Sequence, residues 1–186
     1  MEKQVRYTFD PKASQLTVHA FASGLVSVVA HNPKFAVQEF SGEAKFDSDT
    51  LANASVRMSI KANSLNLQDE VSEYDRREIQ RVTFDEVLEV KMFPAIAFES
   101  TSVAVSKVSE NLYKAKVSGI LSLHGQRGEQ TFNAQAVIGE DSLRGYGDFT
   151  VRQSAFGIRI ASIAGGTLKM KDELKIAFFI IARKEG

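Results

Sequence analysis

The sequence predicts a mainly β protein whose antiparallel strands close into a barrel of about eight strands. Three observations predict it. Apolar and polar residues alternate with a period of two over most of the chain. Short polar turns, such as Asp10-Pro11-Lys12, separate the alternating segments, so consecutive strands can pair directly. A single mid-chain segment, residues 69–90, has helical spacing instead.

The alternating segments are expected to form strands with one apolar and one polar face, as in an antiparallel sheet that covers a core. The apolar positions, in chain order, are Val5, Tyr7, Phe9, Leu16, Val18, Ala20, Ala22, Ala44, Phe46, Val56, Met58, Ile60, Phe132, Ala134, Ala136 and Ile138. We expect about eight to ten strands in all. Alternation fits a filled barrel as well as a hollow one, and a barrel of this size can enclose one small ligand.

Residues 69–90 are expected to form one or two helices in a mid-chain insert. Their apolar positions recur every three to four residues, with charged residues elsewhere. These positions are Val71, Tyr74, Ile79 and Val82. Pro94 ends the helical segment, because a residue that precedes proline is driven out of the α region.

The last predicted strand, residues 174–181, is apolar on both faces. Leu174, Ile176, Phe178 and Ile180 share one face, and Ala177, Phe179 and Ile181 share the other. A strand of this kind is covered on both sides or presents one face to a partner. Either the helical segment covers the outer face, or that face forms the interface of a homodimer.

Composition limits the class of protein. The chain has 186 residues, which suits a single domain over residues 1–186. Lys+Arg and Asp+Glu are both 23, so nothing in the net charge favours a nucleic-acid partner. Cysteine is absent, which excludes disulfides and thiolate chemistry. With neither a secretory signal nor a membrane span in the sequence, we expect a cytoplasmic protein, or a periplasmic one if a leader precedes this chain.

No catalytic constellation emerges from the polar residues. His19, His31 and His124 lack the close spacing of metal ligands. No Gly-x-Ser-x-Gly occurs, and the acidic residues of 69–90 suit a solvated helix face. We therefore expect no enzyme activity, no metal and no cofactor. A metal-assisted enzyme built on the three histidines is kept as the third hypothesis.

Five motifs, in order, resemble those of the YceI-like family of lipid-binding proteins. They are residues 40–47 (F-x-G-x-x-x-F-D), residues 59–65 before a Ser-Leu turn, residues 84–85 with 93–101 (F-P-x-I-x-F-x-S-T), residues 117–125 (V-x-G-x-L-x-x-x-G) and residues 149–158. Two positions of the last motif depart from the family pattern. Gln153 is an additional residue, and Ala155 stands where the family usually has Asp.

The resemblance implies a lipocalin-like eight-stranded antiparallel barrel with an elongated apolar tunnel. In the family, the tunnel holds a polyisoprenoid or another long lipid, such as a quinone or a fatty-acid-like molecule. The function that we expect is therefore non-catalytic binding and carriage, or sequestration, of a long apolar ligand. The alternative is a structural or interaction protein with a filled interior that dimerises through its C-terminal strand.

The residues expected to line the interior are those on the inward faces of the predicted strands, together with phenylalanines of the family motifs. They are Phe9, Val18, Phe46, Val56, Met58, Ile60, Phe98, Phe132, Phe149 and Phe156. A polar head group at the mouth of the tunnel needs a hydrogen-bond donor. His31 and Arg152 are the residues that we expect there.

Overall fold

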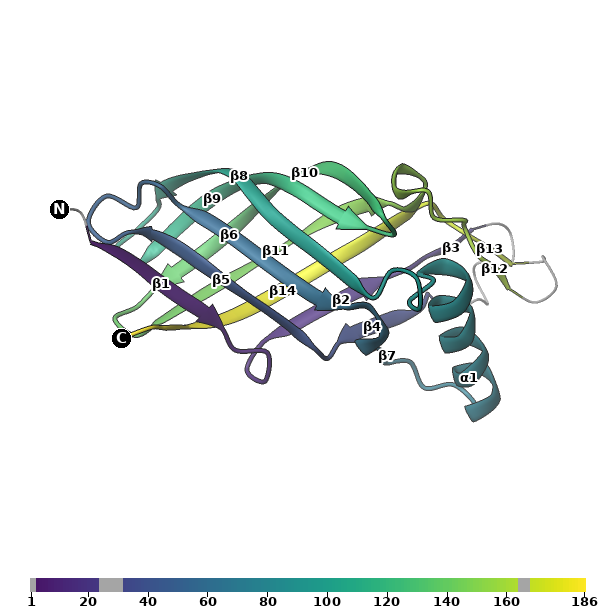
Figure 1. The fold of residues 1–186 in the computed structure, drawn as a ribbon. Helices are drawn as coiled ribbons and strands as arrows, with labels where there is room; N and C mark the ends of the chain where they lie inside the picture. The colour runs from purple at the N-terminus through teal and green to yellow at the C-terminus, as the bar shows by residue number, and fades with distance from the viewer. Residues whose placement is uncertain (1–2, 24–31, 164–167) are drawn as a thin grey trace.

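The computed structural model describes residues 3–23, 32–163 and 168–186, which form a long barrel with a helix at one end (Figure 1). The strands are β1 (Gln4–Phe9), β2 (Gln15–His19), β3 (Ala22–Ser23), β4 (Lys34–Val37), β5 (Phe40–Asp47), β6 (Ser55–Lys61), β7 (Leu65–Leu67), β8 (Ala95–Lys107), β9 (Leu112–Leu123), β10 (Gln126–Ile138), β11 (Ser142–Arg152), β12 (Ser162–Ile163), β13 (Leu168–Met170) and β14 (Glu173–Lys184). The helical elements are α1 (Glu73–Arg81), a π-helical turn (Val82–Val87) and two 3₁₀ turns (Ala62–Ser64 and Gln153–Phe156).

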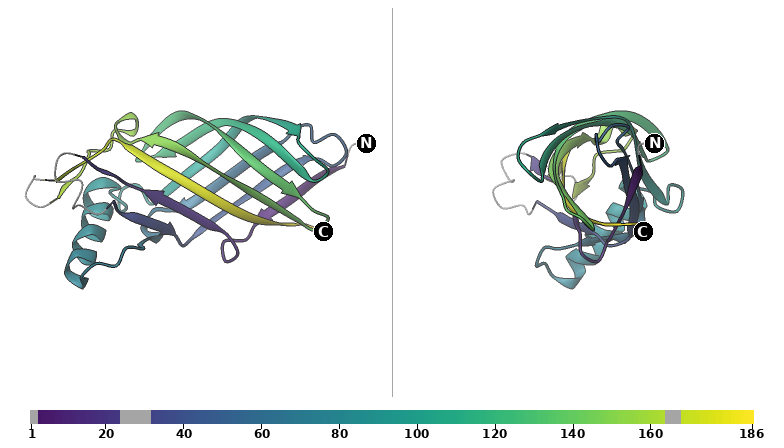
Figure 2. Two further views of the ribbon diagram at one scale, coloured as in Figure 1. Left: turned by 180° about the vertical axis from the view of Figure 1, so that it is seen from behind. Right: turned by 90° about the vertical axis from the view of Figure 1, so that its left-hand side faces the viewer.

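Eight of the described strands pair in a closed antiparallel ring. The order is β1-β5-β6-β8-β9-β10-β11-β14, and β14 pairs back onto β1. Seen along the barrel axis, the strands form a closed ring (Figure 2). Closure leaves none of these strands with a fully unpaired edge. The predicted fold, an eight-stranded antiparallel barrel, is confirmed.

Three of the long strands of the barrel are each interrupted part-way along their length, so each is divided into two of the strands named above. Residues 182–184 of β14 pair with β1, and residues 175–179 pair with β2 in the same direction. β1 and β2 are therefore one long strand, interrupted by residues 10–14. The same relation holds between β5 and β4 and between β6 and β7, so β2, β4 and β7 extend the wall toward the helix.

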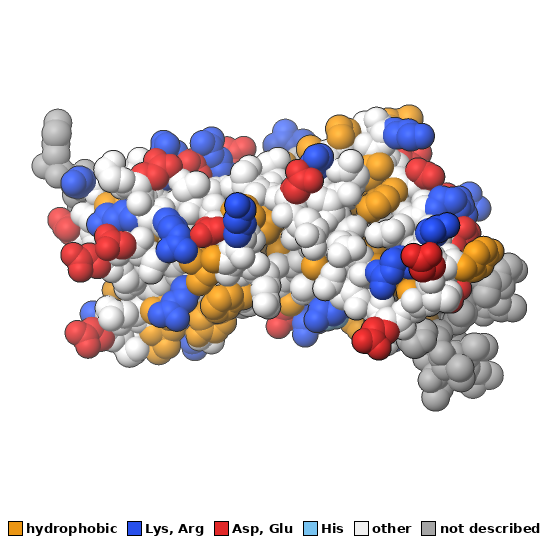
Figure 3. Space-filling model, turned by 90° about the horizontal axis from the view of Figure 1, so that it is seen from below, with side chains coloured by type: hydrophobic (Ala, Val, Ile, Leu, Met, Phe, Trp, Pro, Cys, Tyr) orange, Lys and Arg blue, Asp and Glu red, His pale blue; other side chains and the backbone are white. Residues whose placement is uncertain are grey.

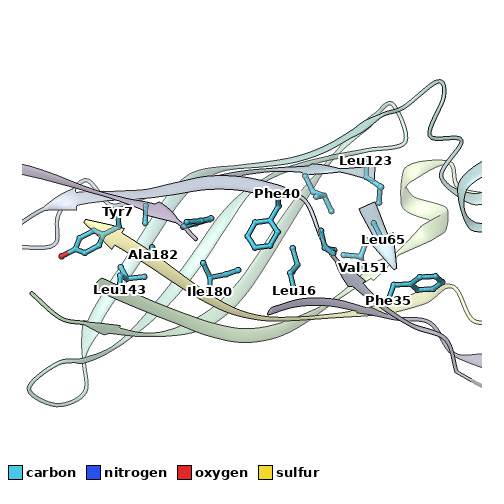
Figure 4. Packing of buried hydrophobic residues seen from close by; sticks show 14 of the residues in the cluster. Tyr7, Leu16, Phe35, Phe40, Leu65, Leu123, Leu143, Val151, Ile180 and Ala182 are labelled. Carbon is cyan, nitrogen blue, oxygen red and sulfur yellow. The ribbon is translucent and has the colours of Figure 1, made fainter. Parts of the chain in front are cut away.

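The inward faces follow the predicted alternation. On β1, Val5, Tyr7 and Phe9 are buried while their neighbours in sequence are exposed. On β6, Met58 is half-buried between exposed residues. The buried side chains lie along the inside of the barrel (Figure 4). This arrangement leaves most polar residues of the strands on the outer surface, although Asp47 at the end of β5 is buried.

The helix lies where the sequence predicts it but is shorter than residues 69–90. A side-chain oxygen of Asp69 accepts from the backbone N–H of Lys34 at 2.8 Å, which keeps the start of the segment extended beside β4. Ser72 then caps α1, and its Oγ accepts from the N–H of Asp75 at 3.1 Å. Tyr74 is 78% exposed, so the prediction that it belongs to the packed face is wrong.

α1 lies at one end of the barrel rather than over the outer face of β14 (Figure 1). Arg76 holds it to the end of β7 by donating to the carbonyl oxygens of Leu67 and Asp69, at 2.6 and 2.7 Å. Phe179, on the outer face of β14, is 40% exposed. The expectation that the helix covers this face is therefore wrong, and the homodimer stays a prediction.

Gly119 of β9 lies where the barrel wall has no space for a side chain. A Cβ there would lie 2.3 Å from the carbonyl oxygen of Glu99 and 2.6 Å from the ring of Phe98. We expect Gly119→Ala to lower the free energy of unfolding by about 1–3 kcal/mol, because the neighbouring backbone must shift. Gly145→Ala is the matched control, since the nearest atom, of Leu143, is 3.9 Å away. Urea unfolding measures both, and equal losses would contradict this account.

Candidate ligand-binding cavity

The barrel encloses a cavity of about 210 Å³, which we call the main cavity. Each of the eight ring strands contributes a lining side chain, and the surface of the cavity is almost wholly apolar. Small residues from β9, β10 and β11, namely Ala115, Ala134, Ala136 and Gly145, form part of the wall. Because these positions carry little or no side chain, the larger residues opposite them leave space in the middle.

Four aromatic rings form one wall of the main cavity. The ring of Phe132 stacks on that of Phe149 at 4.8 Å between centroids. It also packs against Phe98 at 5.5 Å and against the edge of Phe178 at 5.7 Å. The rings come from β8, β10, β11 and β14, so their packing joins four strands around the cavity. Such pairs hold one another in fixed orientations and present rigid apolar surface.

Two further aromatic rings pack at the barrel end opposite the helix. Tyr7 and Phe46 stack at 5.5 Å between centroids. The Tyr7 hydroxyl donates to the carbonyl oxygen of Gly139 at 3.4 Å. Burial raises the pKa of the Tyr7 phenol, and the charge of Asp141 raises it further, so the phenol stays neutral at physiological pH. The Tyr7 side chain therefore brings no charge into this end of the barrel.

A second cavity of about 270 Å³ lies beneath α1 and the π-helical turn. Phe35, Leu65 and Leu174 give it an apolar floor, while Glu78, Arg81, Thr83, Glu86 and Gln153 are among its polar lining residues. Val151 lies between Leu16, which lines the main cavity, and Leu65, which lines the second (Figure 4). A thin layer of buried side chains thus separates the two spaces.

The comparisons with known proteins agree with this geometry. Residues 7–182 match the sequence profile of the YceI-like domain. The chain belongs to the YceI-like family. A curated relative, a UPF0312 protein of Shewanella denitrificans, is 32% identical over 130 residues, which are 66% of this chain and 62% of that protein. The chain thus matches less than two thirds of the length of this relative.

Solved structures of the family share the fold. BcnA of Burkholderia cenocepacia has a TM-score of 0.71 at 21% identity, covering 93% of this chain and 98% of its own. A polyisoprenoid-binding domain of Saccharophagus degradans has a TM-score of 0.69 at 13% identity, covering 96% and 98%. The YceI protein of Campylobacter jejuni has a TM-score of 0.60 at 16% identity, covering 81% and 84%.

Among the described residues, no helix has the length and apolar character needed to cross a bilayer.

Eight of the ten lining residues predicted for this YceI-like chain lie together around the main cavity. They are Phe9, Phe46, Val56, Met58, Ile60, Phe98, Phe132 and Phe149. Val18 lines the second cavity instead. Phe156 is buried in the 3₁₀ turn after β11, with its ring against Gly128, and is not among the residues that line either cavity. Whether any of them contacts a ligand stays a prediction.

Other lining residues went unpredicted although the sequence contains a signal for them. Val103 and Val105 of β8 line the main cavity and alternate with small polar or exposed residues. Tyr113 and Ala115 of β9 also line it, and they alternate with lysines. The same period-two pattern that identifies the other strands could have found them.

The residues expected at the mouth do not both have a described position. Arg152 lies on the outer surface, where its side chain is 71% exposed and its Nε is 3.6 Å from a carboxylate oxygen of Glu173. The alternation of β11 explains this, because Val151 is buried and its neighbour must point outward. Arg152 is not among the residues that line either cavity, and its role at a mouth stays a prediction. His31 lies outside the described residues.

The described histidines lie in separate places. His124 forms the two-residue turn between β9 and β10 with Gly125, and both have positive φ. Its Nε2 lies 2.5 Å from Glu89 Oε2, and its Nδ1 lies 3.2 Å from the carbonyl oxygen of Phe156. His19 lies on β2, 3.3 Å from the hydroxyl of Thr17. Among the described residues, no three His, Cys, Asp or Glu side chains gather where they could hold a metal ion.

His19 gives a pH-dependent prediction. Burial lowers its pKa below the ordinary value of 6.5, and the charges of Lys34 and Lys175 lower it further, against an opposing effect of Asp69. The unfolded chain therefore binds this proton more readily, and the free energy of unfolding falls as the pH drops below 6.5. We therefore expect the free energy of unfolding of His19→Gln, measured relative to that of the wild type, to be higher at about pH 5 than at about pH 8. Urea unfolding at both values tests this, and an identical difference at the two would contradict it.

Proposed function

We propose that this YceI-like protein binds a long apolar molecule in the main cavity and carries or sequesters it without chemical change. The observation that carries the proposal is the almost wholly apolar cavity, which the closed barrel surrounds. Burial of apolar surface drives such binding at roughly 0.8 kcal/mol for each methylene. About ten buried methylenes would contribute near 8 kcal/mol before the cost of ordering the chain.

A polyisoprenoid, a quinone or a fatty-acid-like lipid is the ligand class that we propose. The similarity in fold to the polyisoprenoid-binding domain of Saccharophagus degradans supports this class. The shape of the interior also supports it, because the two cavities lie one after the other along the barrel axis (Figure 4). A molecule long and narrow enough to follow this axis would bury most of its surface.

A non-catalytic role agrees with the chemistry of the described lining. General acid–base or nucleophilic catalysis needs a polar group held beside the reacting atoms. The inward-facing residues of β6, Val56, Met58 and Ile60, offer none, and those of β14 are also apolar. The surface facing a ligand in the main cavity therefore favours solvation of hydrocarbon over reaction.

The alternative function requires an interior filled by the protein's own side chains. A cavity of about 210 Å³ in the barrel is at odds with that requirement. Dimerisation through the outer face of β14 does not depend on a filled interior. Phe179 and its neighbour Tyr146, at 6.4 Å between ring centroids, present aromatic surface on that face. Native mass spectrometry of the purified protein reports both the number of subunits and the mass of any copurified lipid.

Filling the main cavity should abolish ligand binding. We expect Met58→Trp to weaken binding of the apolar fluorophore N-phenyl-1-naphthylamine at least about tenfold, because the indole would occupy the space of the ligand. Ser59→Trp is the matched control, since Ser59 is the next residue of β6 and points outward. Fluorescence titration measures both variants, and circular dichroism confirms that each is folded.

Two results would overturn the proposal. One is unchanged binding by folded Met58→Trp protein, and the other is an equal loss in Ser59→Trp. Should Met58→Trp fail to fold, Ala134→Leu places a smaller obstruction in the same cavity and serves in its place. Binding that survives in this variant counts against the main cavity as the site.

A further inference from the structure

The second cavity differs from the main cavity in its polar lining. Its charged side chains, among the lining residues that the structure describes, are Glu78, Arg81 and Glu86. They come from α1 and the π-helical turn that continues it. Each of the three is half-exposed, so together they form a charged rim between the apolar floor of the cavity and solvent.

The guanidinium of Arg81 donates hydrogen bonds to both carboxylates of this rim. Its Nε and Nη2 donate to both oxygens of Glu78, at 3.1 and 2.7 Å. Its Nη1 donates to Oε1 of Glu86 at 2.9 Å. These hydrogen bonds hold the pKa of Glu78 below its usual range, so this carboxyl remains ionised at neutral pH. Two carboxylates therefore share one cation, and the rim has an excess of negative charge.

Two other polar side chains of the second cavity, Thr83 and Gln153, also donate hydrogen bonds elsewhere. The Thr83 hydroxyl donates to the carbonyl oxygen of Ile79 at 2.7 Å. The carboxamide nitrogen of Gln153, which is 4% exposed, donates to the carbonyl oxygen of Lys171 at 3.0 Å. A hydroxyl that donates once retains its lone pairs, and each carboxylate has further acceptor sites. The two carboxylates and the Thr83 hydroxyl thus offer a ligand hydrogen-bond acceptors beside excess negative charge.

We infer that the second cavity binds the polar end of the ligand and selects an end that donates hydrogen bonds and carries no negative charge. A hydroxyl, a primary amide or an ammonium group meets this requirement, whereas a carboxylate or a phosphate would meet like charge at the rim. Buried side chains such as Val151 separate the two cavities, so they must turn aside for the hydrocarbon chain of the same ligand to reach the main cavity. This inference rests on the proposed function and narrows its ligand class to long apolar molecules that end in a hydroxyl, a primary amide or an ammonium group, which leaves out a free fatty acid and an oxidised quinone.

Three probes that differ only in their polar end test the inference: 1-dodecanol, dodecylamine and dodecanoate. Each displaces N-phenyl-1-naphthylamine from the wild-type protein at pH 7.4 and is kept at monomeric concentrations. We expect the alcohol and the amine to displace the fluorophore at concentrations about tenfold lower than dodecanoate. The double variant Glu78→Gln/Glu86→Gln leaves Arg81 unpaired at the rim, so we expect dodecanoate to gain at least about tenfold relative to dodecylamine.

Glu73→Gln is the matched control. Glu73 also lies on α1 and pairs with an arginine, Arg77, at 3.3 Å, but it is not among the residues that line the second cavity. Its substitution should leave the order of the three probes unchanged. Thermal unfolding of each variant shows that the barrel is intact, and the single variant Glu86→Gln replaces the double variant if the latter does not fold.

The outcomes separate this inference from the proposed function. If all three probes displace the fluorophore equally, the selection is absent while apolar binding stands. A preference that persists in Glu78→Gln/Glu86→Gln, or one that Glu73→Gln shifts equally, shows that the rim is not its cause. If neither the fluorophore nor any probe binds, the proposed function fails, and the inference fails with it.

Discussion

Closure of the sheet by β14 is the constraint on which the rest of the structure depends. One strand pairs with β11 along one edge and with β1 and then β2 along the other. Without the β14 ladder the sheet would be open, and the apolar face of every strand would be exposed to water. The contact joins residues far apart in sequence, such as Tyr7 with Lys184, so loop-closure entropy must be overcome before the interior is sealed. The cavities exist only as a result of this closure.

Closure alone would not leave a space inside. The main cavity persists because alanine and glycine occupy inward positions where β-branched or larger residues would otherwise meet across the barrel. Phe98, Phe132, Phe149 and Phe178 pack on one another along the wall instead of across the middle. Their mutual contacts hold the rings to the side, so the interior combines a large aromatic surface with room for a guest. On the face of the molecule seen in Figure 3, by contrast, charged side chains of both signs are interspersed.

The barrel could be predicted from the sequence because a period of two survives in each strand. Alternation along β1 and β6 assigned the inward faces correctly, and Phe9, Val56, Met58 and Ile60, which lie around the main cavity, followed from it. Alternation fails where the backbone leaves the strand. Phe156 belongs to a 3₁₀ turn. Strand alternation therefore does not determine the direction in which its side chain points. The polar rim was missed for another reason. Glu78 pairs with Arg81 at ordinary helical spacing within α1, but Glu86 reaches the same arginine across the π-helical turn that follows residue 81, and the helical pattern of the sequence gives no sign of this turn.

The attachment of α1 has a consequence for how the interior exchanges with its surroundings. No residue of the helix is buried, and Arg76 supplies its hydrogen bonds to the end of β7. Local unfolding of such an element costs far less free energy than breaking the strand ladders of the ring. Amides of α1 should accordingly exchange with deuterated solvent long before those of β9 or β10. Substitutions in the nine residues of α1 should therefore change how readily this end of the molecule opens, without altering the stability of the strand ring.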